Sequence, residues 1–367
     1  MEKAHIYGLL PEELAGFEAG GLKAQSFRAK QVYSWLYHKY ASSFSAMTNL
    51  SKKAREELNE GFKISSLSIK RVEESKDGTK KFLLESEDKR FFEAVLILMK
   101  EGVKDDEGIS RGERYTLCLS SQIGCRIGCS FCSTARGGFV RNLSAGEIVE
   151  QVVILKREGR IDSTKSVNIV FMGMGEPLDN LDAVSRAIKI LSHKDGLSIS
   201  RRRHTISTSG LAPQIEKLGR LDLGVQIALS LHAVDDSLRS RLIPLNKAYN
   251  IARVLDSLRN FPLASRNRIL FEYLVLGGVN DSLAEAKKLV RLLHGFRAKV
   301  NLIPFNPHKG SEFSRPSKEA LEAFGAYLRA HGLVATIRES RGIDISAACG
   351  QLREKVLEEE GFADRLA

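Results

Sequence analysis

The chain has 367 residues, of which 43% are apolar, 28% are charged and only 8 are proline. This composition excludes disordered, collagen-like and low-complexity proteins, and the length allows one large domain with an appendage or two ordinary domains. The 56 Lys and Arg residues exceed the 45 Asp and Glu residues, and the net charge of +11 favours a polyanionic partner.

The sequence contains no segment suited to a membrane. The N-terminus has no apolar leader, and the longest apolar run, Ala94 to Met99, is too short to cross a bilayer. We therefore expect a cytoplasmic protein that does not associate with membranes.

Residues 1–62 are predicted to form a small helical accessory domain. No acidic residue occurs between Ala19 and Arg55, and apolar residues recur at helical spacing from Phe27 to Tyr37. The pattern indicates a helix with one basic face that contacts nucleic acid. A solvated helix face over an aromatic core fits the same pattern.

Residues 63–111 alternate apolar and polar side chains, which predicts a strand-rich linker with a turn at Asp77-Gly78. The charged run from Lys100 to Arg114 then indicates an exposed loop.

Residues 112–343 repeat a pattern of strand, loop and helix. Ser144 followed by Glu147 predicts a capping box at the start of one helix. Six such units are typical of an α/β fold in which a parallel sheet curls into a partial (βα)6 TIM-like barrel, although a doubly wound open sheet also fits. The predicted strands are Tyr115–Leu119, Val167–Met172, His204–Thr208, Val225–Leu229, Ile269–Val275 and Lys299–Ile303, with Val334–Arg338 as a further candidate.

The five cysteines do not form a disulfide framework. Three of them, Cys125, Cys129 and Cys132, lie within eight residues in the loop after the first barrel strand, while Cys118 and Cys349 stand apart. An odd number with a tight cluster is typical of metal or redox chemistry in a reducing compartment. Zinc and iron–sulfur sites usually take four protein ligands, so one position is unassigned unless a zinc site borrows Cys118 or His204.

Polar residues also follow the other predicted strands. Because the carboxyl ends of parallel barrel strands form one face, we expect these residues to surround a single cavity. The segments are Gly173-Met174-Gly175-Glu176-Pro177, Ser207 with Ser209-Gly210, Ser230-Leu231-His232 and Asn306-Pro307.

Four segments carry a resemblance that extends over nearly the whole chain: Cys118 to Cys125, Cys129 to Ala135, Gly173 to Pro177 and Ala347 to Leu352. On these residues the chain resembles the bacterial RlmN family of dual-specificity RNA methyltransferases, which belong to the radical S-adenosylmethionine (SAM) superfamily. The resemblance implies adenine substrates in 23S rRNA and beside the tRNA anticodon. It also implies a monomer that receives electrons from a donor such as flavodoxin.

The resemblance further implies the cofactors and their ligands. One [4Fe–4S] cluster would be held by Cys125, Cys129 and Cys132, and two SAM molecules would be used per turnover. The residues implied in SAM binding are Gly175, Glu176, Ser207, Ser230, Leu231, His232 and Asn306.

In this family's chemistry, three further residues would act on C2 of adenine. Cys349, in the C-terminal segment 344–367, would carry the methyl group and become bonded to the RNA, and Cys118 would release the product by forming a disulfide with Cys349. Glu93 or Cys118 would accept the C2 proton. Glu93 matches the family's glutamate, although the sequence departs from the family pattern just after it, at Leu98-Met99. Apart from this chemistry, the basic run Arg201 to Arg203 is predicted to contact RNA phosphates near the active face, because the implied target is RNA. A run that only solvates a loop fits the same residues.

Two other functions fit parts of the pattern. The related chloramphenicol–florfenicol resistance methyltransferases share these cysteines but methylate C8 of adenine, whereas Ser133-Thr134-Ala135 and Arg141-Asn142-Leu143 favour the C2 group. A zinc-containing RNA-binding protein without catalysis would leave Cys349 and the SAM-loop residues without a role.

Overall fold

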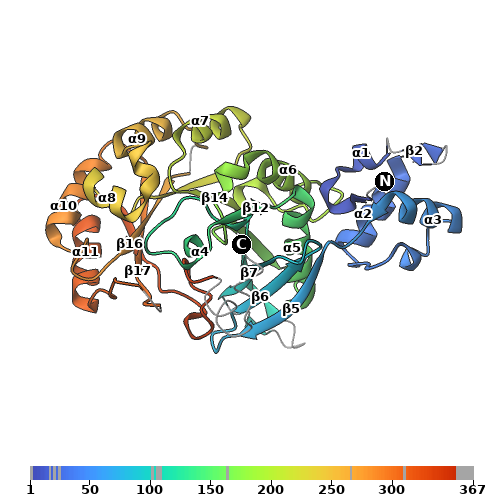
Figure 1. The fold of residues 1–367 in the computed structure, drawn as a ribbon, viewed down its shortest axis with the longest axis horizontal. Helices are drawn as coiled ribbons and strands as arrows, with labels where there is room; N and C mark the ends of the chain where they lie inside the picture. Colours follow the sequence, from blue (N-terminus) through green and yellow to red (C-terminus); the bar gives the residue numbers. More distant parts are fainter. Residues whose placement is uncertain are drawn as a thin grey trace.

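A ten-stranded sheet organises the computed structural model (Figure 1). The structure describes residues 3–15, 18–19, 22–23, 26–100, 103–104, 110–162, 165–264, 267–308 and 311–352. From one edge to the other, the strand order is β18-β17-β16-β15-β14-β13-β10-β7-β6-β5. The strands from β10 to β18 pair in parallel, and β7, β6 and β5 continue the sheet in antiparallel pairing.

The parallel part confirms the predicted partial barrel, and each predicted strand lies within one residue of an observed strand. Buried parallel strands carry nearly continuous apolar sequence, which is why the sequence locates them well. The strands are β10 (Arg114–Cys118), β13 (Ser166–Phe171), β14 (His204–Thr208), β15 (Gln226–Ser230), β16 (Ile269–Val275), β17 (Ala298–Pro304) and β18 (Val334–Ile337).

Helices cover the outer face of this curved sheet. The predicted capping box is present: the Ser144 hydroxyl accepts from the Glu147 backbone N–H, and the Glu147 carboxylate accepts from the Ser144 N–H. The helices are α5 (Ala145–Glu158), α6 (Leu181–Leu191), α7 (Ala212–Leu221), α8 (Asp236–Leu242), α9 (Ile251–Arg259), α10 (Leu283–Leu292) and α11 (Lys318–Ala330). Among the described residues, no helix is long and apolar enough to cross a membrane.

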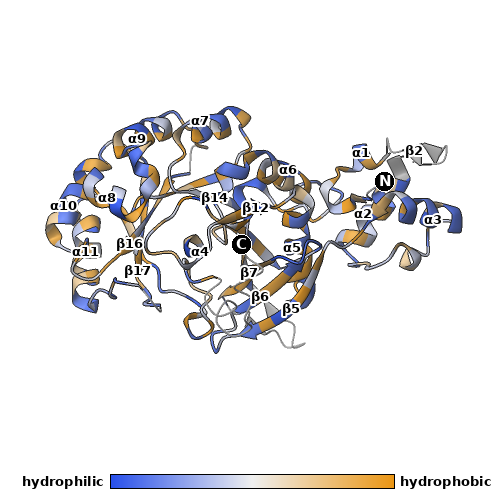
Figure 2. Cartoon of the chain, viewed as in Figure 1, coloured by the Kyte–Doolittle hydropathy of each residue, from blue (hydrophilic) through white to orange (hydrophobic). Residues whose placement is uncertain are grey.

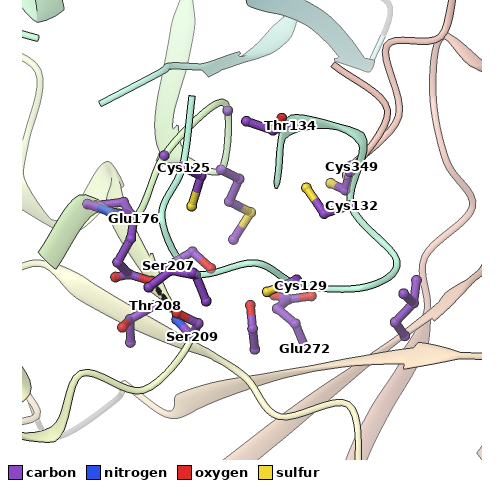
Figure 3. A pocket seen from close by; sticks show the side chains of 18 of the residues that line it. Cys125, Cys129, Cys132, Thr134, Glu176, Ser207, Thr208, Ser209, Glu272 and Cys349 are labelled. Atoms are coloured by element: carbon purple, nitrogen blue, oxygen red, sulfur yellow. Dashed lines mark hydrogen bonds between the residues drawn. The ribbon is translucent and has the colours of Figure 1, made fainter. Parts of the chain in front are cut away.

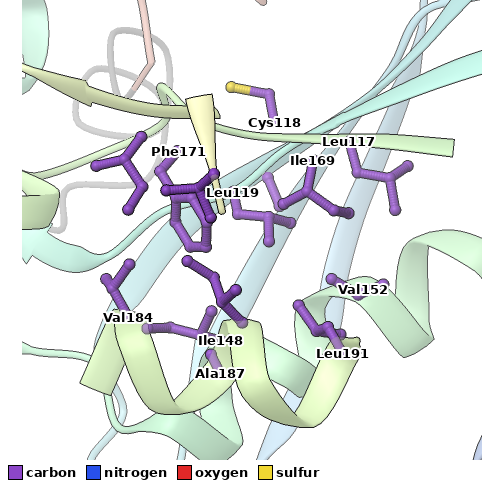
Figure 4. Close-up of a cluster of buried hydrophobic side chains, with 14 of the residues drawn as sticks. Leu117, Cys118, Leu119, Ile148, Val152, Ile169, Phe171, Val184, Ala187 and Leu191 are labelled. Atoms are coloured by element: carbon purple, nitrogen blue, oxygen red, sulfur yellow. The ribbon is translucent and has the colours of Figure 1, made fainter. Parts of the chain in front are cut away.

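The two faces of the central strands have different environments. Leu117 and Ile169 point toward α5 and α6, where they belong to one buried apolar cluster with Ile148 and Leu191 (Figure 4). Cys118 points to the opposite side, into the barrel. Figure 2 shows mostly hydrophobic residues along the central strands and both kinds of residue on the surrounding helices.

The segment before the barrel is part of the same sheet. Strands β5 (Leu67–Glu74), β6 (Lys80–Ser86) and β7 (Phe91–Lys100) form a meander whose first turn contains Asp77 and Gly78, as predicted. Strand β7 then pairs with β10. The charged loop predicted from Lys100 to Arg114 lies partly outside the described residues.

The N-terminal unit contains α1 (Pro11–Ala15), α2 (Ser26–Tyr37) and α3 (Lys52–Gly61), and short two-residue strands complete it. Tyr33 and Tyr37 are buried, and their ring centroids lie 4.9 Å apart. These tyrosines therefore belong to an aromatic core, as expected if α2 presents a solvated face over such a core. The short strand pairs are β1 (Ala4–His5) with β4 (Phe62–Lys63), β2 (Glu18–Ala19) with β3 (Leu22–Lys23), and, after β7, β8 (Val103–Lys104) with β9 (Ser110–Arg111).

The prediction that Arg201 to Arg203 lie near the active face is wrong. They form a short helical turn directly before β14, so they lie at the amino end of that strand. The Arg203 guanidinium donates to the side chains of Ser166 and Asn168 at the start of β13. The carboxyl ends of the same strands open on the other side of the barrel.

Candidate active site

A cavity opens at the carboxyl ends of the parallel strands (Figure 3). Its empty volume is about 920 Å³, open solvent at the mouth included. Nine of the residues singled out in the sequence line it together: Cys125, Cys129, Cys132, Gly175, Glu176, Ser207, Ser230, His232 and Cys349. The barrel topology thus brings together residues that are up to 224 positions apart, from Cys125 to Cys349.

One loop supplies the three clustered cysteines. It begins after β11 (Gln122–Gly124), ends where Cys132 caps the short helix α4 (Ser133–Arg136), and is followed by β12 (Phe139–Asn142). The Cys132 N–H donates to the Cys129 carbonyl at 3.1 Å. Burial raises the pKa of the Cys125 thiol to about 12, so binding of a metal cluster would have to release thiol protons.

The donor set fits a cluster with three protein ligands. All three cysteine side chains reach the same cavity from one loop, whereas Cys118 and His204 are absent from its lining. His204 lies at the amino end of β14, where its Nδ1 is 3.2 Å from the Ser200 carbonyl and burial lowers its pKa to about 4. The structure therefore does not supply the zinc ligands that the alternative interpretation required.

The Gly175-Glu176 loop lies against the base of the cysteine loop. Gly175 has a φ of +103°, and a Cβ atom there would lie 2.6 Å from the Cβ of Gln122 and 2.9 Å from its backbone nitrogen. Only glycine avoids both the left-handed backbone strain and this overlap. The Gln122 side-chain oxygen also accepts from the Glu176 N–H at 2.8 Å.

Glu176 carries a buried carboxylate in the cavity wall. One oxygen accepts from the Ser209 N–H at 2.8 Å and from the Ser209 hydroxyl at 2.6 Å. Burial nevertheless raises the pKa of Glu176, against the opposing effect of these bonds. A cationic ammonium group in the cavity would favour the ionised carboxylate.

His232 is held as a neutral imidazole. Its Nδ1 accepts from the Leu274 N–H at 3.0 Å, and burial followed by the charge of Arg239 lowers its pKa to about 3. The ring also packs edge-on against Phe131 of the cysteine loop, with centroids 5.0 Å apart. The remaining ring nitrogen therefore carries the proton and acts as a hydrogen-bond donor.

Arg239 joins the loops that follow β14 and β15, and the sequence analysis missed it. Its guanidinium is fully buried and donates to the carbonyls of Ser209, Ser230 and Leu231 at 2.7, 3.1 and 3.1 Å. An arginine on an amphipathic helix usually lies on the surface, so the sequence offered no signal for this role.

Glu272 is a second residue that the sequence analysis missed. It lies on β16 and lines the cavity, one of its oxygens accepts from Asn301 at 2.9 Å, and the other has no hydrogen-bond partner among the described residues. Burial raises the pKa of this carboxyl. A single carboxylate inside the apolar run from Ile269 to Val275 was the signal that could have identified it.

Cys349 lies at the boundary between this cavity and a smaller one. The second cavity is also lined by Cys349, together with Ile97, Met99 and Arg338. The Cys349 loop is docked on the cysteine loop, because the Ser133 N–H donates to the Gly350 carbonyl at 2.7 Å. The thiol of Cys349 is exposed.

Cys118 is buried close to Cys349. Burial, followed by the charge of Cys349, raises the pKa of Cys118 to about 12, and the guanidinium of Arg338 opposes that rise. Arg338 is near Cys118, Cys349 and Glu272, which raise its pKa although burial alone would lower it. The sequence analysis also missed Arg338.

Three other predicted site residues lie outside the large cavity. Leu231 is buried, and its N–H donates to the Glu272 carbonyl at 3.0 Å. The side-chain amide of Asn306 is bonded to Ser340 and Arg315. Glu93 is buried in β7 beside Lys81, with 3.2 Å between the Lys81 Nζ and a Glu93 carboxylate oxygen.

Comparisons with known proteins agree with this geometry. The Radical SAM superfamily model matches residues 119–292, and the ribosomal RNA large subunit methyltransferase N-terminal domain model matches residues 5–64. Dual-specificity RNA methyltransferases RlmN from Wolinella succinogenes and Helicobacter hepaticus are 60% and 57% identical, over 92% and 96% of this chain and 95% and 97% of theirs. A crystal structure of a radical SAM methyltransferase from Sphaerobacter thermophilus is 42% identical, with a TM-score of 0.87 over 96% of this chain and 100% of that chain.

The partial barrel and its three-cysteine loop define a radical SAM enzyme, whose cofactors are a [4Fe–4S] cluster and SAM. Within that superfamily the chain belongs to the RlmN family of dual-specificity RNA methyltransferases.

Proposed function

We propose that this RNA methyltransferase adds a methyl group to C2 of adenine in 23S rRNA and in tRNA, with Cys349 as the carrier of the transferred carbon. The observation that carries this proposal is the position of Cys349, which lines both the cavity of the cysteine loop and the smaller cavity beside it. A residue in that position can receive carbon from a cofactor on one side and deliver it to a base on the other.

The large cavity would hold the cofactors. Cys125, Cys129 and Cys132 would ligate the cluster, and the Glu176 carboxylate would accept from the SAM ammonium group. Other SAM-binding residues in the cavity lining would be Gly175, Ser207, Ser230 and His232. Leu231 and Asn306, whose side chains lie outside that lining, would contribute to SAM binding through their backbone. When bound, cluster and SAM supply the methyl group and a 5′-deoxyadenosyl radical.

C2 of adenine is an electron-poor carbon, so simple methyl displacement gives no route to a new carbon–carbon bond. Methylated Cys349, after loss of one hydrogen atom, would bond through its methylene carbon to C2 of an unstacked adenine in the smaller cavity. Glu93 would take the C2 proton. With the C2 proton on Glu93 and one electron passed to a one-electron acceptor, which the oxidised cluster would supply, a thioether remains between Cys349 and the RNA.

Cys118 would then release the RNA. Its thiolate attacks the Cys349 sulfur, the S–S bond forms as the S–CH2 bond breaks, and the freed carbon takes up a proton to become the methyl group. The proximity of the two cysteines supports this step, since Cys349 lies close enough to Cys118 to raise the pKa of its thiol in addition to the effect of burial. An external two-electron reductant restores both thiols.

The accessory unit would select the RNA. We propose that residues 1–62 form an RNA-binding domain and that residues 112–343 form the catalytic core. Residues 63–111 would connect the two. Lys39 lies over the Trp35 ring at 3.8 Å, and Lys30 and Lys39 are exposed, so this unit presents cationic groups beside an aromatic ring. A flavodoxin-type donor and a monomeric state belong to the same proposal.

The test is nucleoside mass spectrometry of rRNA and tRNA from a strain that lacks its own enzyme and is complemented with this chain. We expect 2-methyladenosine in both RNAs, and none with Cys349→Ala. Formation of 8-methyladenosine would instead assign the enzyme to the C8 group, and unmodified RNA with a correctly loaded protein would contradict the proposal.

A further inference from the structure

We infer that Lys81 is a positioning residue for the methyl transfer, which orients the Glu93 carboxylate toward the adenine-binding side of the barrel. This inference rests on the proposed function, in which Glu93 takes the C2 proton. Three observations carry it: the sheet face that the residues share, their burial, and their ion pair.

Lys81, Glu93 and Cys118 lie on one face of the sheet. Val95 on β7 is the cross-strand partner of Lys81 on β6 and of Cys118 on β10. Directly opposite residues in antiparallel strands project to the same side, and so does the residue two positions along, Glu93. Because Cys118 points away from the helix layer, this shared face is the barrel interior (Figure 4).

The Lys81–Glu93 pair is almost completely buried. Both side chains have a relative exposure of 2%, and the Lys81 Nζ lies 3.2 Å from a Glu93 carboxylate oxygen. An ionised carboxylate at this depth is costly without a compensating cation. Lys81 is therefore the cation that compensates the buried Glu93 carboxylate.

Both partners of the Lys81–Glu93 pair are held in place by a second contact. The Lys81 ammonium group is 2.9 Å from Glu73, its cross-strand partner on β5, and it is thus anchored independently of Glu93. The Ser120 hydroxyl donates to the Glu93 carbonyl at 2.5 Å, which holds the backbone of that residue. If Lys81 only linked β6 to β5, its ion pair with Glu73 would be sufficient. The second ion pair, with the fully buried Glu93, would then have no purpose.

Charged and titratable groups reach this face from four described strands and from the C-terminal segment packed against them, which contributes Arg338, Glu339, Arg341 and Cys349 beside Ile97 and Met99. The strand residues are Arg71 and Glu73 on β5, Lys81 and Glu85 on β6, Glu93 on β7 and Cys118 on β10. Glu85 is paired with Lys70 and Lys89 near the edge of the sheet, so its charge is already compensated.

The experiment compares Lys81→Met and Lys81→Arg with the matched control Lys80→Met. Lys80 is the next residue on the same strand, faces the other side, and pairs with Glu74 at 3.2 Å. With reconstituted holoenzyme and a fragment of 23S rRNA, we measure methylation of Cys349, formation of 2-methyladenosine and the dependence of both on pH.

We expect Lys81→Met to retain Cys349 methylation but to form 2-methyladenosine at least about tenfold more slowly at pH 7, a loss equivalent to about 1.4 kcal/mol. The acid limb of its pH profile should move to higher pH, because Glu93 loses its cation. Lys81→Arg should recover part of the rate, and Lys80→Met should behave as wild type. An unmoved acid limb in Lys81→Met would overturn the inference.

A double-mutant cycle covers the case in which Lys81→Met does not fold. Lys81→Met combined with Glu93→Gln removes both buried charges, so this variant avoids an uncompensated carboxylate. If Lys81 acts through Glu93, the double variant is no slower than Glu93→Gln alone; a further tenfold loss would contradict the inference. Failure of the wild-type enzyme to form 2-methyladenosine would instead refute the proposed function itself.

Discussion

Gly175→Ala should destabilise the protein and weaken SAM binding, because the structure leaves no room for a methyl group at this position. The φ of +103° is strained for alanine, at a cost of about 1–3 kcal/mol. The added Cβ would also lie 2.6 Å from the Gln122 Cβ. Relief of that overlap costs about 1–3 kcal/mol more, by analogy with overpacked cores. The sum is a loss of about 2–6 kcal/mol in the free energy of unfolding.

Gly295→Ala is the matched control. Gly295 also has a left-handed φ, +84°, but a Cβ there would have no neighbour within 4 Å in the part of the chain that the structure describes. This control should therefore lose only about 1–2 kcal/mol, the backbone cost.

Denaturant unfolding followed by circular dichroism measures both losses, and calorimetry on the reconstituted proteins measures SAM affinity. We expect SAM affinity to fall at least about tenfold in Gly175→Ala and to be unchanged in Gly295→Ala. Equal losses of stability in the two variants, with wild-type SAM affinity in both, would refute the steric argument.

Four further outcomes are expected. Cys118→Ala should trap RNA covalently on Cys349, visible as a protein band shifted by the RNA; release of methylated RNA at the wild-type rate would argue against the resolving step. Arg239→Met should lower the free energy of unfolding by about 3–5 kcal/mol, because three buried carbonyls lose a charged donor, and it should weaken SAM binding. His204 has a pKa of about 4, below its ordinary value of 6.5, so the unfolded chain binds its proton first as the pH falls. His204 should therefore contribute a decline in stability of about 1.4 kcal/mol per pH unit between pH 6.5 and 4. His204→Gln should remove that contribution and leave the one from His232, whose pKa is also lowered. Anaerobic reconstitution should load about four irons per chain; one zinc ion without iron would exclude the cluster.

The sequence predicted the barrel strands well because each is a short buried run between turn residues. It did not predict that β7 pairs with β10, since cross-strand partners on either side of a loop depend on tertiary packing rather than on local pattern. Nor did it show that Arg201 to Arg203 lie at the amino end of β14, because a basic run looks the same at either end of a strand.

The sequence predicted the part of the site whose residues have an unusual spacing along the chain. Cys125 and its two partners are recognisable from their separation alone. The position of Glu272 in an apolar run was a signal that the analysis did not use, whereas the burial of Arg239 on its helix left no such signal in the sequence. Leu231 and Asn306 were singled out because they follow predicted strands, and the family resemblance implied their SAM-binding role. The structure places their side chains outside the cavity lining. Burial and side-chain direction are properties of the packed fold, and they determine which of these residues line the cavity.

The central claim is that the transferred carbon passes through Cys349 as a methylene group. Incubation of the enzyme with RNA and SAM that carries three deuterium atoms on its methyl group tests this claim most directly, after unlabelled methyl groups have been exchanged from Cys349. The account predicts 2-methyladenosine with two deuterium atoms, because one is lost as the methylene forms and the last hydrogen comes from solvent. Retention of all three deuterium atoms would show direct methyl transfer and contradict the account.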